Sequence, residues 1–159
     1  MKTQREAWID RAETAGPRDP QSTEDAISLF SDPEYCMKYL AFRRWPEGRI
    51  TCPQCGSSNV SWLARRKMWE CRGKHPQAQF SVRSGTFMED SRLGLGQWLT
   101  ALWLIAERDL KISSYEVARK IGVTQKSAWL MMKRIRRAIE LSGIPLEDLV
   151  ATAPRTNSV

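Results

Sequence analysis

Three of the four cysteines and the only histidine of this 159-residue chain fall within one short stretch, residues 52–75. Cys52 and Cys55 form a Cys-x-x-Cys pair, and Cys71 and His75 form a Cys-x-x-x-His pair. A Cys-x-x-Cys turn lets both thiolates reach one ion, and three thiolates with one imidazole suit tetrahedral zinc. Because protein fills all four positions, no place is left for a bound water. The spacing therefore predicts one structural zinc ion held by Cys52, Cys55, Cys71 and His75.

The fourth cysteine, Cys36, offers an alternative to His75 as a ligand. It falls on the apolar side of a predicted helix, where a lone cysteine is usually a core residue, so the sequence favours His75. A further alternative is two buried thiols and a surface histidine without any metal. Clustered cysteines in a reducing compartment hold metal more often than they form disulfides, which favours the metal site.

Short β-strands are expected between and after the ligand pairs. The segments "NVSWLA" and "MWEC" flank the turn "RRK", and "QFSVR" supplies a third strand. Ahead of them we expect a helix that is capped by Ser31 or Asp32, has Pro33 in its first turn and ends near Arg44. Strands this small bury little apolar surface, and a structural metal compensates for that shortage.

The apolar spacing becomes helical in the second half of the chain, where three helices are expected between about Leu95 and Ser142. Ser113 or Ser114 is expected to cap the second helix, and Thr124 the third. The predicted core positions are Trp98, Leu99, Leu102, Ile105 and Ala106 in the first helix, Val117, Ala118 and Ile121 in the second, and Ala128, Met131, Met132, Ile135, Ala138 and Ile139 in the third.

Positive charge is concentrated in the middle of the chain. The net charge is +7, and between residues 36 and 139 Lys and Arg outnumber Asp and Glu by about three to one. Such a region is typical of proteins that bind polyanions, because each neutralised phosphate releases counterions. The alternative is a basic surface that only keeps the protein soluble.

The second and third helices, joined by "IGVT", have the proportions of a helix-turn-helix, in which the start of the last helix enters the major groove. Early polar residues of that helix suit base edges, and later cations suit phosphates. The predicted DNA contacts on it are Gln125, Lys126, Ser127, Lys133, Arg136 and Arg137. A plain three-helix bundle with a solvated charged face is the alternative, and Trp129 either contacts DNA or packs in the core.

A second basic cluster, Arg65, Arg66 and Lys67, occupies the predicted turn between the first two strands. Three cations at the tip of a hairpin can follow a phosphate backbone or enter a groove. They can equally form a soluble turn without a partner.

Taken together, these residues resemble the amino-terminal part of bacterial insertion-sequence transposases of the zinc-ribbon family. The similar segments are "FSDPEYCMKYLAFRRWPEGRITCPQCGS", "WECRGKHPQAQFSVRSGTFMEDS", "QWLTALWLIA" and "SSYEVARKIGVTQKSAWLMMKRIRRAI". The resemblance implies zinc at the four ligands above and recognition of a transposon's terminal inverted repeats. It also implies a following RNase H-like nuclease that binds two divalent metals. Few residues follow Ser142, so no catalytic residue of the family has a counterpart and no enzymatic activity is expected.

The sequence thus predicts an α+β fold, in which a small zinc-ribbon β-hairpin module is preceded by a helix and followed by a three-helix helix-turn-helix domain. The expected segments are a mobile leader (1–24), a helix plus zinc ribbon (25–90), a helix-turn-helix DNA-binding domain (91–142) and a flexible tail (143–159).

The function expected from these features is that of a DNA-binding protein derived from the N-terminal part of a transposase, without its own nuclease. A stand-alone transcriptional regulator and a zinc-ribbon module that binds protein are the alternatives. Double-stranded DNA is the expected partner, with a separate nuclease chain or a second copy of this chain as further candidates. No segment approaches the roughly 20 apolar residues of a membrane span, and the start lacks the apolar core of a secretory signal. We therefore expect a cytoplasmic, nucleoid-associated protein without a membrane partner.

Overall fold

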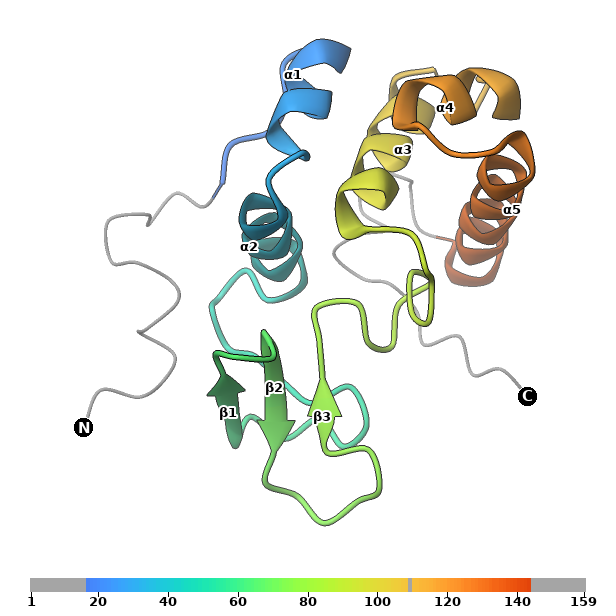
Figure 1. Cartoon of the computed structure of the whole chain (residues 1–159). Helices are drawn as coiled ribbons and strands as arrows, with labels where there is room; N and C mark the ends of the chain where they lie inside the picture. The colour runs from blue at the N-terminus through green and yellow to red at the C-terminus, as the bar shows by residue number, and fades with distance from the viewer. Residues whose placement is uncertain (1–16, 109, 144–159) are drawn as a thin grey trace.

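The computed structural model describes residues 17–108 and 110–143 (Figure 1). The described part is an α+β fold with five helices and one three-stranded antiparallel sheet. The elements are α1 (Thr23–Leu29), α2 (Pro33–Arg44), β1 (Val60–Leu63), β2 (Met68–Cys71), β3 (Gln79–Phe80), α3 (Leu95–Glu107), α4 (Ser114–Ile121) and α5 (Gln125–Ser142). The predictions for residues 1–16 and 144–159 lie outside the described residues.

Residues 17–24, which the sequence assigns to a mobile leader (1–24), include the start of a capped helix and contact α2. Ser22 caps α1 by accepting a hydrogen bond from the backbone N–H of Asp25 at 3.1 Å. Asp25 also forms a 2.6 Å ion pair with Arg18. Asp19 accepts hydrogen bonds from the Tyr39 hydroxyl at 2.8 Å and the Arg43 guanidinium at 2.6 Å. These bonds hold residues 17–24 against α1 and α2.

Helix α2 begins and ends where the sequence predicts. Asp32 is its N-cap and accepts a hydrogen bond from the backbone N–H of Glu34, while Pro33 occupies the first turn. The end of the helix leads to Trp45, whose ring packs on Trp69 of the sheet with centroids 5.4 Å apart. Trp69 in turn lies 5.8 Å from the ring of Phe80 in β3. This aromatic cluster fixes the end of α2 against the sheet.

The sheet has the strand order β1-β2-β3, and both neighbouring pairs are antiparallel. The two predicted strands of the hairpin are confirmed, but the third is only two residues long. It ends early because the backbone N–H of Ser81 bonds to the hydroxyl of Ser84, which turns the chain away from β2.

Helix α3 is buried on most of its surface, since it contacts α1, α2 and α4. Its predicted core residues are buried, except Ala106, which is exposed. Ala101 and Leu104, which the sequence analysis does not place in the core, are also buried, because α3 contacts α1 and α2 as well as α4. Figure 1 shows α3 between α1 and α2 on one side and α4 and α5 on the other.

A close crossing joins the two halves of the molecule. A Cβ atom on Gly96 in α3 would lie 2.1 Å from the carbonyl oxygen of Phe30, the residue that ends α1. Only glycine permits this approach. Buried side chains from all parts of the described chain form one continuous core cluster, so the ribbon and the helices are packed together. None of the helices in residues 17–108 and 110–143 has the length and hydropathy that a membrane crossing requires.

Candidate metal centre and charged surface

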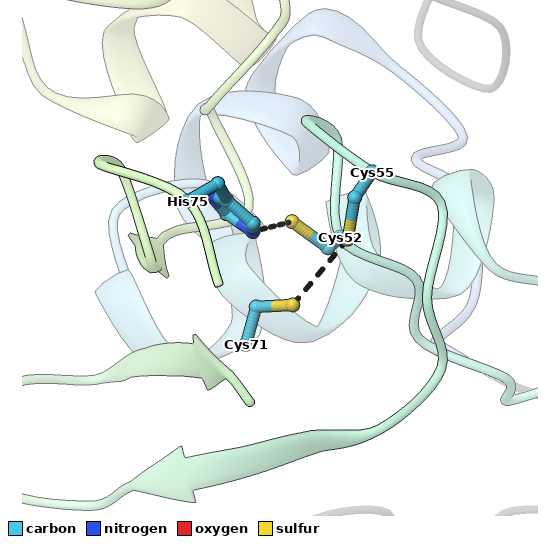
Figure 2. Close-up of side chains that lie close together, drawn as sticks. All are labelled: Cys52, Cys55, Cys71 and His75. Atoms are coloured by element: carbon cyan, nitrogen blue, oxygen red, sulfur yellow. Dashed lines mark hydrogen bonds between the residues drawn. The ribbon is translucent and has the colours of Figure 1, made fainter. Parts of the chain in front are cut away.

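The two ligand pairs predicted from the sequence come together at one end of the sheet (Figure 2). The candidate ligand atoms of Cys52, Cys55, Cys71 and His75 all lie within 4.8 Å of one another. The sulfur of Cys52 lies 3.5 Å from Nε2 of His75, and the sulfurs of Cys55 and Cys71 are also 3.5 Å apart.

These separations can be compared with the edges of a zinc tetrahedron. Zn–S bonds of about 2.3 Å and Zn–N bonds of about 2.0–2.1 Å give edges of about 3.8 Å between two sulfurs and about 3.6 Å between sulfur and nitrogen. The two measured pairs lie close to those values. Three thiolates and one imidazole are also a donor set that zinc prefers, so the four residues fit one structural zinc ion.

Turns on both sides of the cluster explain why these residues meet. After Cys52 the chain folds back, since its carbonyl accepts a hydrogen bond from the N–H of Gly56, which has a left-handed φ of 73°. On the other side the N–H of Gly73 donates to the sulfur of Cys71 at 3.3 Å. A Cβ on Gly73 would lie 3.3–3.5 Å from Cys71, His75 and Cys55, so a larger residue would crowd the ligands.

The surroundings of two of the thiols shift their pKa values in opposite directions. The backbone N–H of Ser57 holds the pKa of Cys55 below its ordinary value, with a smaller effect from the Cys71 thiol. Burial raises the pKa of Cys71. Nε2 of His75 faces the sulfur of Cys52, whereas Nδ1 is buried and has no hydrogen-bond partner among the described residues. Nε2 is therefore the nitrogen that faces the cluster.

Cys36, the alternative fourth ligand, lies outside this cluster. It is fully buried where α2 crosses α3, and its thiol donates a hydrogen bond to the carbonyl of Phe30 at 3.2 Å. Burial raises the pKa of this thiol to about 11, which keeps it protonated. Cys36 is therefore a core residue in the described structure.

The three cations of the hairpin tip, Arg65, Arg66 and Lys67, occupy the turn between β1 and β2 and are all exposed. Arg66 donates a 2.9 Å hydrogen bond to the side chain of Gln79, so it also braces the sheet. Lys67 has a backbone φ of 51°, in the left-handed region, which is unfavourable for a residue with a Cβ atom. In Figure 1 this turn and α5 lie toward opposite sides of the molecule.

The predicted contact residues on α5 divide into two groups. The four cations point into solvent, whereas the two neutral residues hold the start of the helix. Gln125 is half-buried and donates a 2.8 Å hydrogen bond to the hydroxyl of Ser114 at the start of α4. Ser127 is also half-buried and accepts from the hydroxyl of the N-cap residue Thr124. The exposed cations are Lys126, Lys133, Arg136 and Arg137.

Three further arginines join the ribbon to the helices, and sequence reasoning did not single them out. Arg134 of α5 donates to the carbonyls of Phe87 and Glu89, at 3.2 and 3.4 Å. Arg83 donates to carbonyls in the segment before α3. Arg44 donates to the carbonyl of residue 82 at 2.7 Å, and burial lowers its pKa to about 10. Part of the positive charge is therefore structural, and no local sequence signal distinguishes these residues from surface cations.

Trp129 does not pack in the core, since 49% of its surface is exposed. The ammonium group of Lys133 lies over its ring, 5.0 Å from the centroid.

Comparison with known proteins finds a similar family for one part of the chain. Residues 31–73 match the family model of a transposase zinc-ribbon domain. The matched range contains α2 and the three cysteine ligands, and His75 lies just beyond it. No curated protein and no solved structure matches the chain. Residues 31–73 are thus similar to a transposase zinc ribbon, and the cluster that Cys52, Cys55, Cys71 and His75 form fits one structural zinc ion.

Proposed function

We propose that this chain is a zinc-stabilised, sequence-specific DNA-binding module, derived from the N-terminal part of a transposase, that recognises a transposon's terminal inverted repeats. The observation that carries the proposal is the row of exposed cations on α5, in a chain with a segment similar to a transposase zinc ribbon. We assign no catalytic role to the described residues.

The connection between α4 and α5 supports a helix-turn-helix. Helix α4 ends at Gly122, whose φ of 72° turns the chain, and α5 starts at Gln125 directly after its N-cap Thr124. The hydrogen bond from Gln125 to Ser114 ties the start of α5 to the start of α4. Buried residues of both helices belong to the common core, among them Val117. In such a motif the start of the last helix meets base edges.

The exposure and the existing hydrogen bonds of each side chain decide which DNA contacts we expect from α5. The side chains of Gln125 and Ser127 already form hydrogen bonds within the protein, so the first base contact from α5 falls to Lys126, which is exposed. Arg136 and Arg137, two turns or more further along, are placed to bind phosphates. The hairpin tip lies apart from α5, so its cations form a second phosphate contact that is separable from the first by mutation.

Selection of bound duplexes from a random pool tests the proposal. The zinc-loaded protein should recover a consensus sequence. Lys126→Ala should change the preferred bases, whereas Arg136→Ala should weaken all sites alike and reduce the salt slope by about 1. Lys38→Ala is the matched control, because Lys38 lies on α2 and pairs with Glu34. It removes the same charge and should leave the consensus unchanged.

Recovery of no consensus would exclude sequence-specific binding. Equal, non-selective losses from Lys126→Ala and Arg136→Ala would show that α5 does not enter the major groove.

A further inference from the structure

The outer face of α5 combines cations with two large apolar side chains. Trp129 is 49% exposed and Leu130 is 47% exposed, although both lie in the second turn of a well-packed helix. Full burial of a large apolar side chain stabilises a protein by about 1.5–3 kcal/mol, and these half-exposed side chains forgo part of that stabilisation. A contiguous exposed apolar surface rimmed by polar groups is typical of a binding site, and Trp129 and Leu130 are neighbours in the chain.

Helical spacing places Trp129 among the cations. The buried residues of α5 recur at the spacing of one face, and Lys126, Trp129 and Lys133 follow each other by three or four residues on the opposite face. Trp129 therefore stands one turn after Lys126, within the part of the helix that meets base edges in a helix-turn-helix. The ammonium of Lys133, 5.0 Å from the ring centroid, holds the indole from the other side.

The charge around Trp129 determines which partner suits it. A second copy of this chain would bring the same cations against one another, which is unfavourable. A polyanion is attracted by them, and α5 offers an indole edge between the charges. In the major groove the apolar feature of the base pairs is the C5 methyl group of thymine.

We propose that Trp129 is a specificity-determining residue that contacts the C5 methyl group of a thymine, while Lys133 orients the indole and reaches toward phosphate. This inference rests on the proposed function, because it requires α5 to lie in the major groove. It adds a base preference that the cations alone do not provide.

Replacement of thymine by deoxyuridine tests the inference, since it removes only the methyl group. Each thymine of the selected duplex is replaced in turn, and affinity is measured for every duplex. For wild-type protein we expect a loss of about fourfold at one or two positions, the equivalent of one buried methyl group, about 0.8 kcal/mol. Trp129→Ala should bind the thymine duplex more weakly and should no longer distinguish thymine from uracil at those positions.

Two control variants distinguish the contact with the thymine methyl group from a loss of affinity that does not depend on the base. Leu130→Ala removes the neighbouring exposed apolar side chain and should keep the discrimination between thymine and uracil. Arg136→Ala should weaken binding to both duplexes equally, because it removes a charge of α5 and leaves the ring and Lys133 in place. Circular dichroism of Trp129→Ala should match wild type, as expected for the loss of a half-exposed side chain.

The outcomes distinguish the inference from the proposed function. If wild-type protein binds every thymine duplex and its uracil counterpart with equal affinity, the thymine contact is refuted and the proposed function still stands. This result needs no variant. Retained discrimination in Trp129→Ala would also refute the contact. Failure of the zinc-loaded protein to bind any duplex would overturn the proposed function and the inference with it. A change in oligomeric state on mutation of Trp129, with duplex binding unaffected, would assign the surface to self-association instead.

Discussion

The substitution Gly96→Ala tests the close crossing that joins the helical half of the molecule to α1 and α2. A Cβ at this position would stand 2.1 Å from the carbonyl oxygen of Phe30, whereas ordinary contacts begin near 3.4 Å. The obstructing atom belongs to the backbone, so no side-chain rotation relieves the clash. The same Cβ would lie 3.5 Å from the sulfur of Cys36, which donates a hydrogen bond to that carbonyl. The segment between α1 and α2 must therefore move by about 1 Å.

The expected cost follows from two opposing effects. Overpacking of a well-packed core costs about 1–3 kcal/mol and sometimes more, and a backbone clash of this size belongs at the upper end. Alanine is favoured over glycine by about 1 kcal/mol in a helix interior, and Gly96 stands in the first turn of α3, so this value is an upper bound on the gain. We therefore expect Gly96→Ala to lower the free energy of unfolding by about 2 kcal/mol or more.

Urea unfolding followed by circular dichroism, with zinc in excess, measures this difference. Gly94→Ala is the matched control, since it lies at the N-cap of the same helix and its Cβ would meet only the end of the Gln97 side chain, 3.8 Å away. This change should cost about 0.5–1 kcal/mol, because glycine is preferred over alanine at an N-cap. If both variants unfold at the same urea concentration, α3 does not cross the α1–α2 junction as closely as described.

Three further substitutions address the metal centre, the junction and the hairpin tip. His75→Ala should lower bound zinc measured by mass spectrometry and chelator competition, whereas Cys36→Ala should keep one zinc per chain; unchanged zinc affinity in His75→Ala would exclude His75 as a ligand. Arg134→Ala should lower the free energy of unfolding by about 0.5–1.5 kcal/mol, because it removes hydrogen bonds to two carbonyl groups that water can reach in part, and an unchanged urea midpoint would show that these bonds do not stabilise the junction. Lys67→Gly relieves a left-handed backbone while it removes a cation, so stability should stay the same or rise by up to about 1 kcal/mol. Its duplex affinity should fall at the same time, and undiminished affinity would remove the hairpin tip from the interface.

The metal centre and most of the helices could be predicted because their signals are local. The paired spacing of Cys52 with Cys55 and of Cys71 with His75 is visible in the chain, and the structure brings these four together. Caps such as Asp32, Ser113 and Thr124 also act within one helical turn, so their positions agree with the structure.

Features that depend on distant contacts could not be predicted in this way. Helix α1 is only seven residues long, too short for an apolar period, although Ser22 followed by Asp25 gives a capping signal. Gly96 resembles any helical glycine until Phe30 is seen beside it. Arg134 lies among surface cations in the sequence, and its role comes from carbonyl groups far away in the chain.

The salt dependence of binding to the selected duplex tests most directly whether the zinc-loaded protein holds DNA through its exposed cations. Seven exposed cations are proposed as contacts, three at the hairpin tip and four on α5. Each neutralised phosphate contributes about −0.9 to the slope of log K against log salt, so contacts by half or more of these cations give a slope of roughly −3 to −6. A slope near zero, or no duplex binding at low salt, would contradict the proposed function.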